Sequence, residues 1–269
     1  MTDTDRFHLE GKTVILTGSA GRLGSHFAET FASTNANLIL VDTEEEKNTK
    51  LRKKLKDKSK GKIVVKSTDV SDEQNVKNMV KEIRQEFKTI DVLVNNAHYV
   101  PRGDPNIDAK FEKFPLSLWE KTIQSNLNNI FLCCREVGRT MIKQKFGSII
   151  NVSSIYGIVG PDQRIYGKSR LNSPSFYSAT KGAVVNLTRH LASEWGKYNV
   201  RVNTLTLGGV YDKKLHGNSE FVKNYSKRTM LGRMANPNDY DGAILFLASD
   251  SSKYMTGSNL IIDGGWTAW

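Results

Sequence analysis

A tyrosine and a lysine at helical spacing are the residues of this sequence best suited to chemistry. Tyr177 and Lys181 lie four positions apart, so a helix would place both on one face. A nearby ammonium favours the phenolate, and the spacing predicts that the tyrosine pKa falls from about 10 towards neutrality. Ser153 and Ser154 follow the apolar run Ile149–Val152 and could bind a carbonyl oxygen. This group predicts a proton-donating site for a carbonyl, provided that another group supplies a hydride.

Strand-like and helix-like patterns alternate along the sequence around this site. The apolar runs are continuous and β-branched, which is typical of parallel strands covered on both faces. Strands are expected at Thr13–Leu16, Leu38–Val41, Ile63–Val65, Val92–Val94, Ile149–Val152, Val200–Val202 and Leu260–Ile262. The alternation and the lack of a composition break predict one α/β domain over residues 1–269. Its doubly wound parallel sheet would have about seven strands and helices on both faces.

Two segments rich in proline and glycine, 98–116 and 157–176, interrupt the pattern and are expected to be loops at the C-terminal ends of strands, where ligands bind. The second is an enlarged loop between Ser154 and Tyr177. Its polar and charged residues include Asp162, Arg164, Tyr166, Lys168 and Arg170. Arg164 could clamp a carboxylate or phosphate of a substrate, although a solvated flap is equally consistent. Tyr156 could either line the substrate site or simply pack.

A glycine-rich turn follows the first expected strand and opens the first expected helix. It reads Thr17-Gly18-Ser-Ala-Gly21-Arg22-Leu23-Gly24. Glycines at such a turn let backbone N–H groups and the helix N-terminus approach a pyrophosphate. Asp42, at the end of the next strand, could accept hydrogen bonds from an adenosine ribose and repel a 2′-phosphate, so NAD is favoured over NADP. Asp42 would also suit a helix N-cap, and Arg22 could instead contact a phosphate and weaken that preference.

Composition excludes several other functions. The net charge of +11 is concentrated in the lysine-rich stretch 47–66, which has no interleaved aromatic residues to stack on bases. A solvated helix face is therefore favoured over an anion-attracting patch, and no specific nucleic acid is expected as a partner. No apolar run is long enough for a transmembrane helix, and the acidic N-terminus is unlike a secretory signal. The adjacent Cys133 and Cys134 and the scattered histidines show no metal-ligand spacing. A cytoplasmic protein without a metal is expected.

Several separated motifs together resemble the short-chain dehydrogenase/reductase family, of the single-domain, Rossmann-like type. The resemblance runs from about Leu9 to the C-terminus. Its motifs are Thr17–Gly24, Asp69-Val70, Asn95-Asn96-Ala97, Asn126, Ser154, Tyr177 with Lys181, Arg201-Val-Asn203 and Asp263-Gly264-Gly265. Any one of them could occur by chance, whereas the combination is specific.

The resemblance implies a hydride transfer between C4 of a nicotinamide and a secondary alcohol or ketone. It makes Tyr177 the general acid/base, Lys181 the group that lowers its pKa and binds the nicotinamide ribose, and Ser154 the hydrogen-bond donor to the substrate oxygen. Asn126 is expected to hold a proton-relaying water. The implied cofactor-binding residues are Gly18, Gly21, Arg22, Leu23, Gly24, Asp42, Asp69, Val70, Asn96, Ala97, Tyr177, Lys181, Gly208 and Val210. A homodimer or homotetramer is also implied.

The sequence departs from the family pattern at a few positions. The glycine turn has the spacing TGxxGxxG, His98 replaces a usual glycine, Leu207 replaces a usual proline, and the interval between Ser154 and Tyr177 is longer than usual. The long loop resembles that of oxidoreductases from bacterial sugar-modification and nonulosonate gene clusters and, more loosely, of gluconate-type dehydrogenases. A sugar, sugar acid or nucleotide-sugar is therefore the expected substrate. The alternatives are a 3-oxoacyl-carrier-protein reductase and a non-catalytic NAD-binding scaffold protein.

Overall fold

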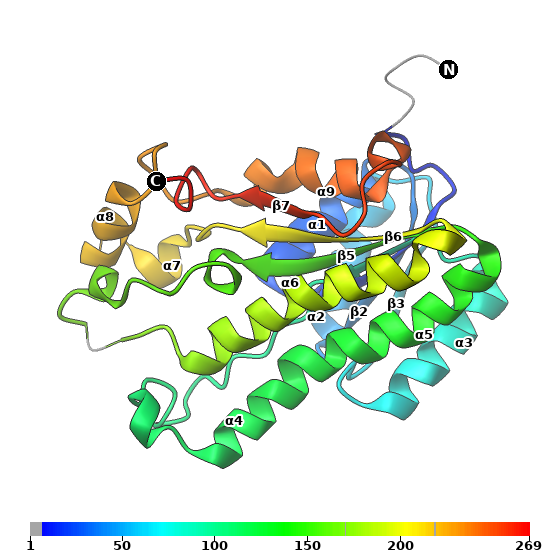
Figure 1. The fold of residues 1–269 in the computed structure, drawn as a ribbon. Coiled ribbons are helices and arrows are strands. Elements are labelled where there is room, and N and C mark those ends of the chain that lie inside the picture. Colours follow the sequence, from blue (N-terminus) through cyan, green and yellow to red (C-terminus); the bar gives the residue numbers. More distant parts are fainter. Residues whose placement is uncertain (1–6, 170, 218) are drawn as a thin grey trace.

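A seven-stranded parallel sheet forms the centre of the protein, seen in a computed structural model that describes residues 7–169, 171–217 and 219–269 (Figure 1). The strand order is β3-β2-β1-β4-β5-β6-β7. The strands are β1 (Thr13–Thr17), β2 (Asn37–Asp42), β3 (Ile63–Ser67), β4 (Val92–Asn95), β5 (Gly147–Ser154), β6 (Val200–Leu207) and β7 (Asn259–Ile262). Each of the strands expected from the sequence is present, and each extends beyond the expected bounds.

The chain changes direction across the sheet between β3 and β4. It runs outward from β1 through β2 to β3, and then crosses back to place β4 on the other side of β1. Such a switch point leaves a crevice beyond the C-terminal ends of the two central strands, where open α/β sheets bind ligands. The glycine-rich turn follows β1 and residues 96–98 follow β4, so both segments meet at this crevice.

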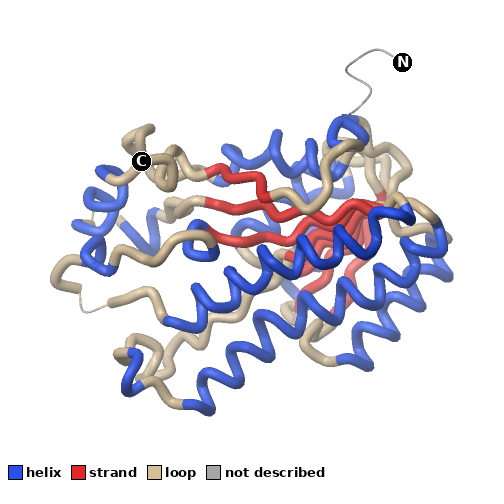
Figure 2. The backbone as a smooth tube through the Cα atoms, viewed as in Figure 1, coloured by secondary structure: helices blue, strands red, loops and turns tan. Residues whose placement is uncertain are grey.

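Helices cover both faces of the sheet, as Figure 2 shows. They are α1 (Arg22–Ala32), α2 (Glu45–Lys56), α3 (Glu73–Phe87), α4 (Leu116–Ile123), α5 (Asn129–Gln144), α6 (Ser175–Trp195), α7 (Lys213–His216), α8 (Glu220–Lys227) and α9 (Asp241–Ala248). Successive side chains of a strand point to opposite faces. Accordingly Val14 and Leu16 of β1 join a core with α1, α2 and α9, whereas Ile15 joins a second core with α3, α5 and α6. The doubly wound fold predicted from the sequence is confirmed.

Two loops extend beyond the C-terminal ends of β4 and β5, where they were expected. Segment 98–116 contains only a short 3₁₀ turn before α4, and segment 157–176 contains another at Gln163–Tyr166. The second loop is closed on itself by paired hydrogen bonds of 3.0 and 2.9 Å between Gln163 and Ser173. Asn172 Nδ2 donates to the Asp108 carbonyl at 2.8 Å and so links the two loops. The enlarged loop is therefore held against its surroundings rather than projecting freely.

Candidate active site

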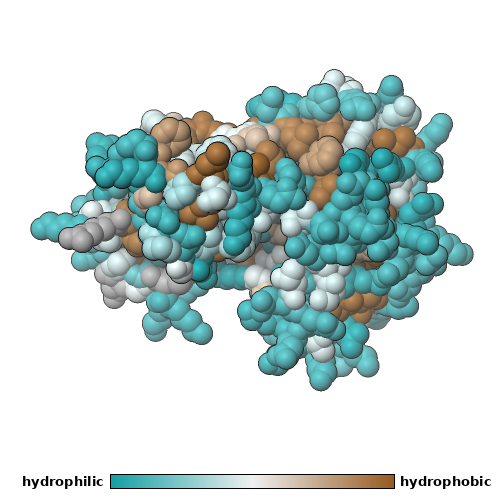
Figure 3. Space-filling model, turned by 90° about the horizontal axis from the view of Figure 1, so that it is seen from below, coloured by the Kyte–Doolittle hydropathy of each residue, from teal (hydrophilic) through white to brown (hydrophobic). Residues whose placement is uncertain are grey.

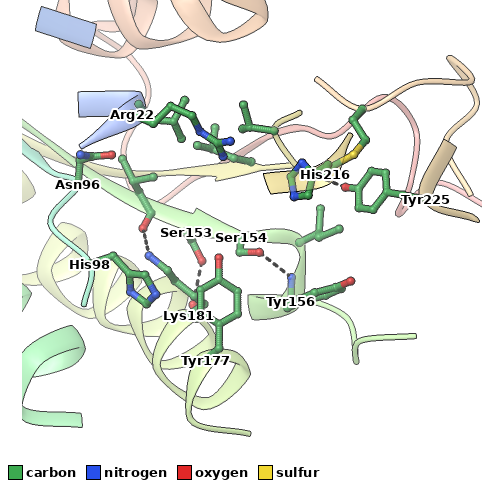
Figure 4. Close-up of a pocket in the computed structure, with 18 of the residues that line it drawn as sticks. Arg22, Asn96, His98, Ser153, Ser154, Tyr156, Tyr177, Lys181, His216 and Tyr225 are labelled. Carbon is green, nitrogen blue, oxygen red and sulfur yellow. Dashed lines mark hydrogen bonds between the residues drawn. The ribbon is translucent and has the colours of Figure 1, made fainter. Parts of the chain in front are cut away.

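The first two turns of α6 and the end of β5 bring Tyr177, Lys181 and Ser154 together (Figure 4). Lys181 is buried, and its Nζ donates a 2.9 Å hydrogen bond to the Val152 carbonyl of β5. The same nitrogen lies 6.0 Å from the centre of the Tyr177 ring. The spacing of Tyr177 and Lys181 thus places both groups on one face of α6, against the strand that carries the serines.

The two serines have different contacts. Ser153 Oγ donates to the Lys181 carbonyl at 2.9 Å, which joins β5 to α6 and gives this hydroxyl a structural contact. Ser154 Oγ accepts from Tyr156 N at 3.2 Å, so its own proton can still be donated. Figure 4 shows the Ser154 hydroxyl and the Tyr177 ring facing the same space. Ser154 is the serine placed to bind a substrate oxygen.

The expected lowering of the Tyr177 pKa is wrong for this structure. Burial raises the pKa of Tyr177 above its ordinary value, and its hydrogen bond with Ser154 acts in the opposite direction. Lys181 Nζ binds the Val152 carbonyl, and burial is the larger of the two influences on the Tyr177 phenol. Tyr177 is therefore a protonated acid at neutral pH.

Burial also acts on the lysine. It disfavours the ammonium and lowers the pKa of Lys181 to about 8. The lysine is still largely charged at neutral pH, but it loses its charge under mildly alkaline conditions. A charged Lys181 would stabilise the phenolate that forms if Tyr177 gives up its proton.

Asn126 lies in a π-helical turn (Gln124–Asn128) between α4 and α5, a feature that often marks functional sites. Its side chain accepts from Tyr99 N at 2.7 Å and donates to the Tyr99 carbonyl at 2.9 Å. The amide oxygen and the amide nitrogen of Asn126 therefore both hold the loop that follows β4. The expected role in holding a relay water stays a prediction.

The glycine-rich turn is tightly packed against the segment after β4. A Cβ at Gly18, whose φ is +67°, would stand 2.6 Å from Ala97 Cα, and a Cβ at Gly24 would stand 2.0 Å from the Gly18 carbonyl oxygen. Asn96 Nδ2 donates to the carbonyls of Thr17 and Gly18 at 3.1 and 3.2 Å. The turn is thus fixed close to the sheet, and the glycines at 18 and 24 are required by this packing.

A cleft of about 400 Å³ runs along the ends of β1, β2, β3 and β4; we call it the side cleft. Of the predicted cofactor residues, it is lined by Gly18, Asp42, Asp69, Val70 and Ala97. Asp42 accepts from Ala20 N at 3.0 Å and from Glu44 N at 3.1 Å, which fixes its carboxylate at the cleft wall. The side cleft therefore lies beside the glycine turn and beyond the strand ends, where open α/β sheets bind nucleotides.

A second space of about 360 Å³ opens above Tyr177 and Ser154; we call it the main cavity. The predicted residues Arg22, Leu23, Asn96, Tyr156, Lys181, Gly208 and Val210 also line it. Arg22 pairs with Asp212 at 3.0 Å. Gly21 is in neither lining; its N–H donates to the Gly18 carbonyl within the glycine turn.

Arg164 does not reach the main cavity. Its side chain is 85% exposed, and its guanidinium binds Asp162 at 2.7 Å, within its own loop. Arg170, also noted in this loop, lies outside the described residues. The structure therefore offers no contact through which Arg164 would clamp a substrate.

Several lining residues were not selected from the sequence. They are His98, Tyr166, His216, Phe221 and Tyr225. His98 carried a signal, because it departs from the family pattern directly after Asn96-Ala97. The others come from the enlarged loop, α7 and α8. Their rings contact one another, with 5.3 Å between the ring centres of Tyr166 and Phe221 and 5.9 Å between those of Phe221 and Tyr225. Only the tertiary packing of these segments brings them to the site.

Two further properties can be checked in the described part of the chain. It contains no cluster of three or more His, Cys, Asp or Glu residues arranged to hold a metal ion. None of its helices has the length and apolar character needed to cross a membrane.

The doubly wound fold, the crevice at its switch point and the arrangement of Tyr177, Lys181 and Ser154 are those of an oxidoreductase of the short-chain type. A family profile described as "Enoyl-(Acyl carrier protein) reductase" matches residues 18–267. Sorbose reductase of Candida albicans is 33% identical over 264 residues, covering 98% of this chain and 89% of that protein. A 3-oxoacyl-[acyl-carrier-protein] reductase of Chlamydia muridarum is 34% identical over 259 residues, covering 96% and 98%. The chain belongs to the short-chain dehydrogenase/reductase family.

Solved structures agree in fold over nearly the whole chain. A gluconate 5-dehydrogenase from Burkholderia cenocepacia, in complex with NADP and tartrate, superposes with a TM-score of 0.86 at 29% identity, covering 98% of each chain. The resemblance of the loop to nonulosonate-cluster enzymes stays a prediction.

Proposed function

We propose that this protein interconverts a secondary alcohol and a ketone on a small polyhydroxylated molecule, with NAD as the hydride acceptor. The observation that carries the proposal is the convergence of the Tyr177 phenol and the Ser154 hydroxyl on the main cavity, with Lys181 buried behind them. In the reductive direction Ser154 donates a hydrogen bond to the carbonyl oxygen. Tyr177 then gives its proton to that oxygen while the carbonyl carbon gains a hydride.

The protein's part in this reaction is positioning and charge. The nicotinamide cofactor, when bound, supplies or accepts the hydride. The raised pKa of Tyr177 keeps the phenol protonated and ready to donate, and the Lys181 ammonium stabilises the resulting phenolate. In the oxidative direction the same phenolate accepts the proton of the alcohol.

The side cleft supports NAD as the preferred cofactor. Its Asp42 carboxylate is held by two backbone N–H groups at the end of β2, where a ribose is expected. A 2′-phosphate at this point would face a fixed negative charge. We therefore favour NAD, although the gluconate 5-dehydrogenase structure named above contains NADP.

The main cavity favours a small, uncharged polyol or ketose over the other expected substrates. Its volume of about 360 Å³ is at the lower end of the range for small-molecule sites, which disfavours a nucleotide-sugar. Its lining cations are already engaged, Arg22 by Asp212 and Lys181 by the Val152 carbonyl. The hydroxyl groups of Tyr156 and Tyr166 and the surrounding rings offer hydrogen bonds and flat surfaces instead.

The names of relatives support the same substrate class. They include the sorbose reductase and a D-threitol dehydrogenase of Mycolicibacterium smegmatis, which is 32% identical over 263 residues. Because the relatives also include a 3-oxoacyl-[acyl-carrier-protein] reductase, a 3-oxoacyl thioester is the second candidate substrate.

We also propose that the protein acts as a homo-oligomer. Phe131 on α5 is 47% exposed and its ring lies 5.2 Å from the Arg135 guanidinium. Viewed from the side of α4, the surface carries hydrophobic patches among hydrophilic ones (Figure 3). Size-exclusion chromatography with light scattering would test this; a monomer at micromolar concentration would contradict it. The single domain and the cytoplasmic location stay predictions.

A substrate screen tests the proposed function. Purified protein would be assayed for NADH formation with glycerol, threitol, sorbitol and gluconate, and for NADH or NADPH consumption with sorbose and an acetoacetyl thioester. We expect turnover of a polyol or ketose, with NAD preferred over NADP. Turnover of the thioester alone, with NADPH, would indicate a carrier-protein reductase instead. NAD binding without any turnover would favour a scaffold protein.

A further inference from the structure

His98 lies where the main cavity meets the side cleft, and it lines both. It follows Asn96-Ala97 on the loop after β4. Its ring stands edge-on to Tyr177, with 5.1 Å between ring centres and an interplanar angle of 73°. Figure 4 shows the ring beside Lys181 and Tyr177. A titratable side chain thus adjoins both groups that the proposed reaction uses for proton transfer.

Both ring nitrogens of His98 are shielded from solvent, and neither has a hydrogen-bond partner among the described residues. A buried polar atom left unsatisfied loses its hydrogen bonds to water without replacement, so such an atom needs an explanation. Its neighbour Asn126 favours the protonated ring, but it makes no well-aligned hydrogen bond with either nitrogen and binds the Tyr99 backbone instead. The nitrogens of His98 are therefore free to bind a hydroxyl group or a water molecule within the site.

The surroundings keep this imidazole uncharged. Burial lowers the pKa of His98 to about 3, and the positive charge of Lys181 contributes to the lowering. Tyr177, Lys181 and Asn126 lie around the ring, and Arg22, Lys121, Asp42 and Asp69 line the same two spaces. A neutral imidazole has one N–H donor and one acceptor nitrogen, so it can take a proton on one side while giving one from the other.

We propose that His98 is a proton-relay residue that returns protons to the Tyr177–Lys181 pair from water at the mouth of the side cleft. This inference rests on the proposed function. After Tyr177 has given its proton to the substrate oxygen, the phenolate recovers a proton from Lys181 Nζ, directly or through a hydroxyl between them. One nitrogen of His98 then gives its proton to the lysine through a bridging water, and the other takes a proton from water. One proton passes from solvent to Tyr177 in each reductive turnover, and the path runs in reverse during oxidation.

Three variants separate a relay from a packing role. His98→Phe keeps a ring but has no nitrogen, His98→Gln keeps hydrogen bonds but cannot exchange tautomers, and His98→Gly leaves a space. We expect kcat to fall at least about 10-fold in all three, since a positioned proton-transfer group contributes roughly 10²–10⁴-fold. The KM for NAD should change little, and the solvent deuterium isotope effect on kcat should rise. Wild-type kcat and an unchanged isotope effect in His98→Phe would overturn the proposal.

Chemical rescue gives a readout that packing alone would not produce. Added imidazole should restore turnover in His98→Gly, whereas 1-methylimidazole, which lacks the N–H donor, should not. Equal rescue by both compounds would mean that the ring only fills space, and the proposal would be wrong. Near-wild-type circular dichroism and NAD affinity would show that the variant is folded.

A measurement independent of turnover separates this inference from the proposed function. In ¹⁵N-histidine-labelled protein with NADH bound, the His98 signals, assigned by comparison with His98→Gln, should show one protonated and one unprotonated nitrogen from about pH 5 to about pH 8. An imidazolium in this range would overturn the relay even if the enzyme turns over. A wild-type protein without dehydrogenase activity would contradict the proposed function instead, whatever the state of His98.

Discussion

Lys181 Nζ binds the Val152 carbonyl at 2.9 Å, so the lysine of α6 is anchored on the strand that carries Ser154. Ser153 Oγ completes the connection by donating to the Lys181 carbonyl at 2.9 Å. These two hydrogen bonds hold the start of α6 against the end of β5. They fix the position of Tyr177 relative to Ser154. The Lys181 ammonium, whose charge the proposed reaction needs, is buried at this junction.

The burial of Lys181 predicts a pH-dependent difference in stability between the wild type and Lys181→Met. Because the folded-state pKa of about 8 lies below the ordinary 10.5, the penalty for the buried charge is present in full below about pH 8. It is lost as the pH rises from about 8 to 10.5. The free energy of unfolding of the wild type should therefore rise relative to Lys181→Met over this range, by on the order of 3 kcal/mol. Urea unfolding of both proteins at about pH 7 and about pH 10 checks this. The same difference in free energy of unfolding at both pH values would contradict it.

Gly24→Ala should disrupt the turn before α1. The new Cβ would stand 2.0 Å from the Gly18 carbonyl oxygen, a contact that forces the backbone to move. We expect a loss of roughly 1–3 kcal/mol in stability and a marked weakening of NAD binding. Gly242→Ala in α9 is the matched control, because no atom lies within 4 Å of its new Cβ. Calorimetry and NAD titration would compare them; equal NAD affinity in both variants would refute the assignment of the turn.

Asp42→Ala should shift the cofactor preference from NAD towards NADP. The carboxylate is fixed at the wall of the side cleft by Ala20 N and Glu44 N, so its removal takes away both a ribose acceptor and a repulsive charge. We expect kcat/KM for NAD to fall about 10-fold or more, as for the loss of hydrogen bonds to a charged group. Asp57→Ala, an exposed acid at the end of α2, should leave the ratio unchanged. An NAD preference that survives Asp42→Ala would be evidence against this role.

Tyr156 and Arg164 should respond differently to substitution, although both were considered for substrate binding. Tyr156 lines the main cavity, whereas Arg164 is exposed and paired with Asp162. Tyr156→Phe should raise the substrate KM by about 2–10-fold, the effect of one lost hydrogen bond. Arg164→Ala should leave kcat and KM within about twofold of the wild type. Steady-state kinetics with the substrate found in the screen decide between them, and a large KM increase in Arg164→Ala would show that the loop rearranges to bind substrate.

The fold was predictable from the sequence because local patterns determine it. Continuous β-branched runs indicated each strand, and the glycine turn after the first run indicated where a dinucleotide site is expected. Tyr177, Lys181 and Ser154 could be brought together from helical spacing and the end of one strand. The expectation that failed, a lowered pKa of Tyr177, depended on burial, and the substrate role of Arg164 stays a prediction. Spacing alone cannot show that burial raises the pKa of Tyr177, or that Arg164 folds back onto Asp162.

The aromatic wall of the main cavity was not predictable for the same reason. Phe221 and Tyr225 of α8 meet Tyr166 of the enlarged loop, far away in the sequence. Asn224 Nδ2 donates to the Ile165 carbonyl at 3.3 Å and helps to hold the two segments together. No short-range pattern in the sequence predicts this contact.

The most direct test of the central claim is the turnover of Tyr177→Phe with the substrate that the wild type uses. The variant keeps the ring and its packing but loses the proton that the reaction requires. We predict that kcat falls by about 10²-fold or more while the Kd for NADH, measured by fluorescence titration, stays within about threefold of the wild type. Near-wild-type turnover in Tyr177→Phe would contradict the account.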